Sequence, residues 1–185
     1  NLPKNIIDLD FNIEKNISLL SQSMNVKPDE LTACVLKRPR HDHIIKSLNN
    51  LNVKINFIDD GDVSAVLAVG DKNSEIDIYI GTGGGPEGVL AAAGLKCLDC
   101  QMQTRLVFQN KHEEDRAKKM GIKDTAKKYY IDDMIKGDVI FCATGVTDGD
   151  IIKGIKDEGE FFLAETFVLH NSSKTNKIFK NLIKK

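Results

Sequence analysis

The chain has 185 residues, and its 26 basic and 27 acidic side chains nearly cancel. This length suits one globular domain, and a hydrophobic share of 41% is enough to form a core. The even charge balance argues against a general nucleic-acid binder. No apolar run approaches the ~20 residues of a membrane span, and no secretory leader opens the chain. With four cysteines in no dense pattern, we expect a cytoplasmic protein without membrane or nucleic-acid partners.

Apolar residues recur at helical or strand spacing through the first half of the chain. The spacing predicts helices over residues 13–24, 41–51, 62–69 and 89–98. It predicts strands over residues 31–36, 53–58 and 75–80. A glycine-rich loop, residues 81–88, connects the last of these strands to the last of these helices.

The second half is less regular but continues the alternation. We expect strands over 105–108 and 138–143, a charged helix over 113–120, a helical turn over 131–135, and late β elements over 161–169 and 177–183. Such alternation predicts an α/β fold with a mostly parallel or mixed sheet flanked by helices. Ligands of these sheets bind at the carboxyl ends of the strands. Four polar segments are therefore expected to converge on one site: residues 37–41, 59–62, 81–88 and 144–150.

The glycine-rich loop is the most informative segment. Its glycines let backbone N–H groups approach a ligand, and the helix start that follows favours anions. The spacing fits neither a P-loop nor the dinucleotide-binding fingerprint. Glu87 would repel a phosphate unless a divalent cation lay between them, and Mg²⁺ and Mn²⁺ both bind carboxylate oxygens. The alternative is that Glu87 only complements the helix dipole, and spacing does not decide between the two.

Segment 37–41 places Arg38, Pro39, Arg40 and His41 just past a predicted strand. Arginine forks bind phosphate bidentately, and proline stiffens the segment that carries them. The alternative is a solvated basic turn. His41 and His43 lie beside the arginines and are further candidates for a phosphate contact.

Segment 59–62 places three carboxylates around Gly61 at the end of another predicted strand. Such a group can bind metal, accept hydrogen bonds from sugar hydroxyls, or cap the next helix. Asp62 is well placed to be the N-cap of the helix predicted after it. Capping accounts for one aspartate and leaves the other two to be explained.

Cys97 and Cys100 have C-x-x-C spacing near a predicted helix end. The helix dipole there does not stabilise a thiolate, so we favour structural thiols over a redox pair. Neither a serine nor a cysteine has an evident base beside it. Cations, carboxylates and a glycine-rich helix start together indicate a site for a phosphorylated, hydroxylated small molecule with a metal.

Five blocks resemble one known family. They are LKRPRH at 36–41, DGDV at 60–63, GTGGGPEGVLAAAGLKCL at 81–98, MQTRL at 102–106 and FCATGVTDGD at 141–150. In content, order and spacing they are similar to the class II fructose-1,6-bisphosphatases of bacteria. The resemblance runs from about residue 6 to about residue 178 and covers the carboxy-terminal half of the family pattern.

The resemblance implies the carboxy-terminal domain of the lithium-sensitive sugar and inositol phosphatase fold. We expect one α/β domain over residues 1–185. Residues 1–28 would form a leading strand and helix, and residues 29–185 the substrate-phosphate and metal-binding core. The family's amino-terminal half, which holds most acidic metal ligands and activates water, is not matched. The catalytic residues are expected in that half.

The activity that the resemblance implies is hydrolysis of the 1-phosphate of fructose 1,6-bisphosphate to fructose 6-phosphate in gluconeogenesis, with Mn²⁺ or Mg²⁺. Carried over by position, the substrate-binding residues are Arg38, Pro39, Arg40, Asp60, Gly61, Asp62 and Gly84, and the metal ligand is Glu87. Gly85 and Cys100 depart from the residues common in the family, without a consequence expected for the chemistry.

Two alternatives stay open on the sequence. The chain is either part of a metal-dependent bisphosphatase or a sugar-phosphate-binding module that does no chemistry. Sedoheptulose 1,7-bisphosphate is an alternative substrate, because it presents the same 1-phosphate end. A surface left exposed by the missing half would favour association, so we expect a homo-oligomer when the protein is complete.

Overall fold

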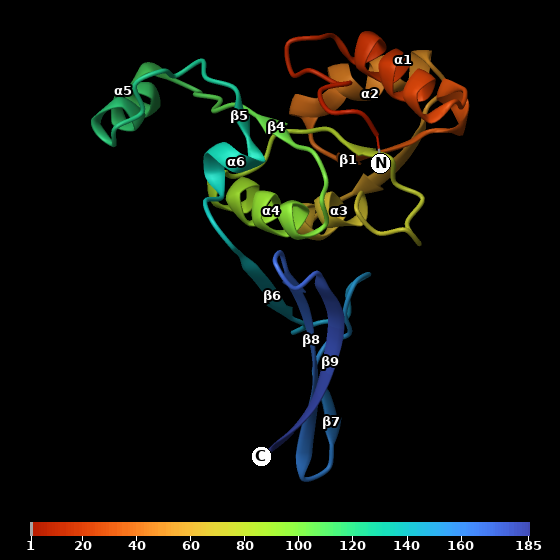
Figure 1. The fold of residues 1–185 in the computed structure, drawn as a ribbon, viewed down its shortest axis with the longest axis vertical. Coiled ribbons are helices and arrows are strands. Elements are labelled where there is room, and N and C mark those ends of the chain that lie inside the picture. Colours follow the sequence, from red (N-terminus) through yellow and green to blue (C-terminus); the bar gives the residue numbers. More distant parts are fainter. Residues whose placement is uncertain (1) are drawn as a thin grey trace.

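A three-stranded parallel sheet organises the first half of the computed structural model, which describes residues 2–185 (Figure 1). Strand β1 (Thr32–Leu36) lies between β2 (Lys54–Ile58) and β3 (Ile78–Tyr79). Residues 33–36 of β1 are all buried. This continuous apolar run is typical of a parallel strand that is covered on both faces.

Helices cover both faces of this sheet (Figure 1). Helices α1 (Ile13–Met24) and α2 (Asp42–Asn50) lie on one face, and α3 (Asp62–Ala68) contacts β1 and β3 from the other. The core on the first face consists of Ile17, Leu20, Leu31, Ala33, Val35, Ile44, Leu48, Val53 and Ile78. Single 3₁₀ turns, η1 (Pro28–Glu30) and η2 (Pro39–His41), precede β1 and α2.

Helix α4 (Gly85–Cys97) lies beside α3, between the parallel sheet and the antiparallel sheet described below. A Cβ at Gly94 of α4 would collide with the side chain of Leu67 in α3, so the two helices pack closely there. Beyond α4, β4 (Gln103–Thr104) pairs with β5 (Tyr129–Tyr130). Between them the chain forms α5 (Lys111–Lys119), which has no buried residue, and the single turn α6 (Ile131–Met134) follows.

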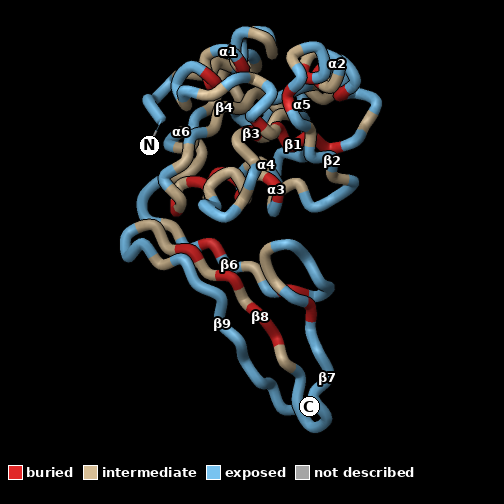
Figure 2. The backbone as a smooth tube through the Cα atoms, turned by 90° about the vertical axis from the view of Figure 1, so that its right-hand side faces the viewer, coloured by how far each residue is buried: buried red, intermediate tan, exposed pale blue. Residues whose placement is uncertain are grey.

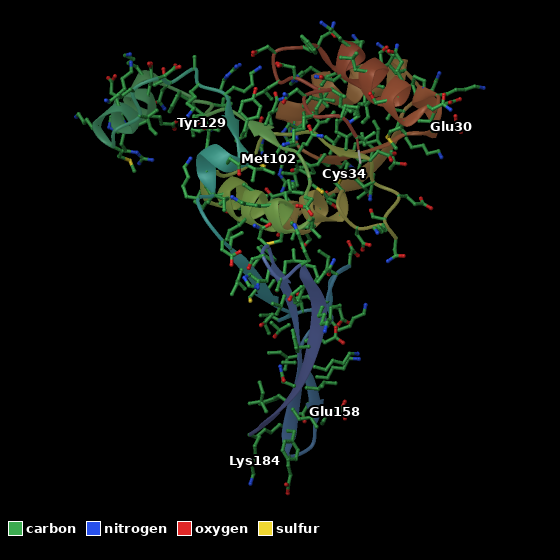
Figure 3. The ribbon with its side chains drawn as sticks, viewed as in Figure 1. Glu30, Cys34, Met102, Tyr129, Glu158 and Lys184 are labelled. Carbon is green, nitrogen blue, oxygen red and sulfur yellow. The ribbon has the colours of Figure 1, made fainter. Side chains whose placement is uncertain are left out.

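A second, antiparallel sheet projects from the far side of α4 (Figure 1). Its long strand β8 (Phe161–His170) pairs with β6 (Ile140–Thr144) and β7 (Lys156–Glu158) on one edge and with β9 (Thr175–Lys184) on the other. One core joins this sheet to α3 and α4, and it consists of Leu67, Leu95, Cys97, Phe141, Phe167 and Leu169. Figure 3 shows Glu158 and Lys184 at the tip of the sheet, far from Cys34 in β1.

Several predicted elements differ from the structure. The strand predicted over 75–80 is reduced to β3, because Asp77 Oδ2 accepts the Thr32 N–H at 2.8 Å just before the ladder begins. No strand forms over 105–108, where Val107 is 68% exposed without a neighbouring strand. Among residues 2–12 the expected leading strand is absent, and turns precede α1.

The sheet arrangement also differs from the prediction of a mostly parallel or mixed sheet, because the strands form separate sheets. The late β elements over 161–169 and 177–183 are confirmed, but they build a separate antiparallel sheet with β6 and β7. The predicted fold class, an α/β fold with a parallel sheet flanked by helices, is confirmed for the first half. None of the helices formed by residues 2–185 has the length and apolarity to span a bilayer.

Candidate functional site

Three of the four polar segments meet at the carboxyl end of the parallel sheet. Segment 37–41 follows β1, segment 59–62 follows β2, and segment 81–88 follows β3. The order β2–β1–β3 places the arginines between the aspartates and the glycine-rich loop. The backbone N–H of Lys37 still donates to the Ile58 carbonyl at 2.8 Å, which ties the first two segments together where their strands end.

Arg38 bridges the ends of β1 and β2. Its Nη1 donates to the Lys37 carbonyl at 2.8 Å, and its Nη2 donates to the Asp59 carbonyl at 2.7 Å. The remaining N–H groups of the guanidinium are available to an anion. Beside Arg38 lies an open cavity of about 610 Å³, lined by Lys37, Arg38, Pro39, Asp42, Ile45, Phe57 and Asp59.

Arg40 binds the glycine-rich loop, whereas Arg38 binds the segment after β2. Its Nε and Nη2 both donate to the Thr82 carbonyl, at 3.1 and 2.7 Å. Pro39, the first residue of η2, holds the turn that separates the two arginines. As a result Arg38 reaches the aspartate segment and Arg40 reaches the glycine-rich loop. Segment 37–41 is therefore not a free basic turn, because both guanidinium groups bind neighbouring loops.

The aspartate segment turns sharply into α3. Gly61 has φ +77°, a conformation that favours glycine, and the N-cap of α3 is Gly61. The prediction that Asp62 is the N-cap is therefore wrong, since Asp62 is the first helical residue. Freed from capping, its carboxylate faces the loop, and a Cβ at Gly83 would lie 2.8 Å from Asp62 Oδ2. Asp60 accepts the N–H of Gly61 at 2.8 Å.

The glycine-rich loop runs directly into α4. The helix begins at Gly85, four residues before the predicted start, and its N-cap Gly84 supplies no side-chain cap. Glu87 lies in the first turn, and its carboxylate folds back so that a Cβ at Gly84 would collide with it. Residues 81–87 are exposed, so a ligand can reach the loop. This position fits both interpretations of Glu87, as a metal ligand and as a negative charge that interacts favourably with the helix dipole.

The carboxylates of the site do not form a complete metal-binding set. Asp62 and Glu87 both border the glycine-rich loop, and carboxylate oxygens suit hard divalent ions. However, no group of three or more His, Cys, Asp or Glu side chains with metal-binding geometry occurs among residues 2–185. These residues fit part of a metal shell, and further ligands would have to come from elsewhere.

His41 has a different position from the one predicted. Its side chain is 1% exposed, and both ring nitrogens bind backbone groups of the chain. Nδ1 lies 2.7 Å from the Leu36 carbonyl oxygen, and Nε2 accepts the Thr82 N–H at 2.9 Å. The predicted phosphate contact is therefore wrong for His41, because neither nitrogen is free. Sequence reasoning missed Thr82 altogether, since a threonine within a glycine run gives no signal of its own.

The fourth polar segment, residues 144–150, does not join the other three. Asp148 Oδ1 accepts the Gly154 N–H at 2.9 Å, so this loop folds back on itself. Asp150 lines a cavity of about 890 Å³ together with Thr32 and Lys54, the first residues of β1 and β2. The segment thus faces the amino ends of the parallel strands. The predicted convergence fails for it because its strand, β6, belongs to the other sheet.

Three of the four cysteines, Cys34, Cys97 and Cys100, have the environment of structural thiols, whereas Cys142 is exposed. Cys97 is buried and its Sγ donates to the Val139 carbonyl at 3.6 Å. Burial raises the pKa of both the Cys97 and the Cys100 thiol, and it raises the pKa of Cys34 to about 11. Raised pKa values oppose thiolate formation and therefore redox reactivity.

Comparison with known proteins gives one consistent result. The family model described as bacterial fructose-1,6-bisphosphatase, glpX-encoded, matches residues 1–182. The class 2 fructose-1,6-bisphosphatase of Haemophilus influenzae is 34% identical, over 93% of this chain. The Escherichia coli K12 protein named fructose-1,6-bisphosphatase 1 class 2 is 35% identical over the same share. A Synechococcus protein named D-fructose 1,6-bisphosphatase class 2/sedoheptulose 1,7-bisphosphatase is 34% identical, again over 93% of the chain.

The chain spans about half the length of these curated relatives. The matched region makes up 56% of the Haemophilus protein, 55% of the Escherichia protein and 53% of the Synechococcus protein. The similarity therefore covers nearly all of this chain and only part of each relative.

Proposed function

The chain belongs to the bacterial fructose-1,6-bisphosphatase family, and we propose that it supplies the substrate-phosphate-binding part of a metal-dependent sugar bisphosphatase. The reaction is hydrolysis of the 1-phosphate of fructose 1,6-bisphosphate to fructose 6-phosphate. The Haemophilus and Escherichia relatives are named as fructose-1,6-bisphosphatases. The finer fold assignment, the carboxy-terminal domain of the lithium-sensitive phosphatase fold, is part of the same proposal.

The observation that carries this proposal is the position of Arg38 and Arg40. Both guanidinium groups lie at the carboxyl end of the parallel sheet, and each binds a neighbouring loop through backbone carbonyls. Their other N–H groups have no hydrogen-bond partner among residues 2–185 and can bind a phosphate bidentately. A pair of anchored arginines flanking a proline suits one phosphate dianion better than a diffuse basic surface would.

The other residues divide the remaining tasks. Backbone N–H groups of the loop around Gly84, at the start of α4, add donors for phosphate oxygens. Asp60 and Asp62 accept hydrogen bonds from sugar hydroxyls, and Gly61 provides the turn that presents them. Glu87 supplies one oxygen ligand to Mn²⁺ or Mg²⁺. When bound, such a metal polarises the phosphoryl group and lowers the pKa of water.

The incomplete set of metal-binding carboxylates agrees with these proposed roles. One ligand, Glu87, comes from this chain, and further acidic ligands come from outside residues 1–185. We propose that the catalytic residues lie there too, that the core of the binding part is residues 29–185, and that the assembled enzyme is a cytoplasmic homo-oligomer. Sedoheptulose 1,7-bisphosphate is a second candidate substrate, because the name of the Synechococcus protein includes both activities.

The test is calorimetric titration of the chain with fructose 1,6-bisphosphate, in the presence and absence of Mn²⁺. Replacing Arg40→Ala removes charge-assisted hydrogen bonds worth about 1.5–3 kcal/mol each, so we expect the affinity to fall roughly tenfold or more. The matched control is Lys54→Ala, which removes an exposed cation at the amino end of β2. Equal affinities for both variants would contradict the proposed site.

Phosphate release measured in the same samples separates the alternatives. Binding without turnover is expected of the chain alone, because its metal set is incomplete. Metal-dependent turnover would show instead that residues 1–185 hold the whole catalytic site. The proposal that the catalytic residues lie outside this chain would then be wrong.

A further inference from the structure

We propose that His41 is a positioning residue that holds Arg40 and the glycine-rich loop in one fixed arrangement. The inference rests on the proposed function, since it concerns how the same phosphate site is held in shape. His41 ends η2, next in sequence to Arg40, and its side chain is 1% exposed. It is a buried polar group directly beneath exposed binding residues.

The hydrogen bonds of the ring define a single neutral tautomer. The backbone N–H of Thr82 can only donate, so Nε2, at 2.9 Å, must be the acceptor and carries no proton. The proton is then on Nδ1, which donates to the Leu36 carbonyl at 2.7 Å. One imidazole thus links the last residue of β1 to the loop that follows β3.

The two neighbours Arg40 and His41 bind the same residue of the loop. Arg40 donates to the Thr82 carbonyl through Nε and Nη2, while His41 accepts from the Thr82 N–H. The N–H and the carbonyl of Thr82 are therefore both held by segment 37–41. Any displacement of the loop must break these bonds together, so the arginine and the loop donors keep their spacing.

The loop is also fitted to the ring sterically. A Cβ at Gly81 would lie 3.3 Å from His41 Cε1 and 3.5 Å from both His41 Nε2 and the Tyr79 hydroxyl. Contact at 3.3 Å is tighter than most side chains accept, so the backbone approaches the imidazole closely because residue 81 is glycine. Ring, hydroxyl and loop form one packed unit under the phosphate-binding groups.

The test compares two variants of the full chain. His41→Phe keeps an aromatic ring but loses both hydrogen bonds, whereas His41→Gln keeps an acceptor that can reach the Thr82 N–H. Calorimetric titration with fructose 1,6-bisphosphate measures the affinity. Amide hydrogen exchange of Thr82 measures whether the loop is held, and urea unfolding measures stability.

We expect His41→Phe to weaken binding roughly fivefold and to speed Thr82 exchange by a similar factor, because the loss of a hydrogen bond costs about 1 kcal/mol and about 1.4 kcal/mol corresponds to tenfold. His41→Gln should restore most of both. Wild-type affinity and unchanged Thr82 exchange in His41→Phe would overturn the proposal. So would a loss of stability in both variants with no change in affinity, because that result describes an ordinary core histidine.

Failure of the proposed function gives a different result. If the wild-type chain does not bind fructose 1,6-bisphosphate, the proposed function fails, while Thr82 exchange still reports on His41. Faster exchange in His41→Phe alone would then support the link between the segments, and equal exchange in all three proteins would overturn it.

Discussion

The two sheets of this molecule differ in how much of each is covered. Strand β1 of the parallel sheet is buried from residue 33 to residue 36, with helices on both sides. Strand β9 of the antiparallel sheet is exposed from residue 176 to residue 184, as Figure 2 shows. The polar segments of the candidate site follow the strands of the parallel sheet, which is the covered one. Binding loops thus lie on the part of the chain whose backbone is best fixed by packing.

The antiparallel sheet is attached through a narrow contact. Phe141, Phe167 and Leu169 pack against α3 and α4 near the base of the sheet. Toward the tip, large apolar side chains are uncovered, with Leu182 63% and Ile183 54% exposed. The stability of the chain should therefore depend strongly on the first sheet and weakly on the tip of the second.

The largest expected effect comes from a pair of leucine truncations, one in each region. Leu48 in α2 is fully buried in the core against β1, whereas Leu182 in β9 is 63% exposed. Leu48→Ala should lower the free energy of unfolding by about 2–5 kcal/mol, because it removes transfer energy and leaves a cavity. Leu182→Ala should cost less than about 1 kcal/mol. Urea unfolding monitored by circular dichroism compares the two, and equal costs would contradict the contrast between the sheets.

A smaller effect is expected where the second sheet joins the first region, at Asp138. Its carboxylate accepts hydrogen bonds from Ser172 Oγ at 2.7 Å and lies 2.8 Å from His170 Nε2. These bonds lower the pKa of Asp138 from its ordinary 3.8 to about 2. A lowered folded-state pKa stabilises the fold above the ordinary value, and this contribution disappears as the pH falls from about 4 to about 2.

Asp138→Asn should therefore lower the urea midpoint at pH 7 and make little difference near pH 2, where most of this contribution is lost. The comparison needs only unfolding curves of both proteins across this pH range. A difference that is the same at every pH would mean that the lost contact is steric rather than ionic.

Much of the first region could be predicted from sequence because its signals are local. The apolar run over 31–36 and the helical spacing over 13–24 gave β1 and α1 within one residue. The short β3 could not be predicted, since Asp77 replaces part of the ladder with a side-chain hydrogen bond. The separate second sheet could not be predicted either. Its position depends on the packing of Phe141, Phe167 and Leu169 against distant helices.

The candidate site was predictable to a similar degree. Strand ends carry the arginines, the aspartates and the glycine-rich loop, so the general rule for parallel sheets brings these three segments together. The same rule failed for residues 144–150, because it holds only for strands of one parallel sheet. The hydrogen bonds of His41 to Leu36 and Thr82 link residues up to 41 positions apart, so no local sequence pattern could predict them.

The most direct test of the proposed binding site is a titration with fructose 1,6-bisphosphate monitored by NMR. The chain is labelled with nitrogen-15, and its backbone amide signals are followed as ligand is added. We predict shifts at residues 37–41, 59–62 and 81–88, with no change at 144–150 or along β9. Shifts confined to residues 144–150 or to the antiparallel sheet would contradict this prediction. They would place the binding site on the antiparallel sheet or at the amino ends of the parallel strands, away from the proposed site at the carboxyl ends.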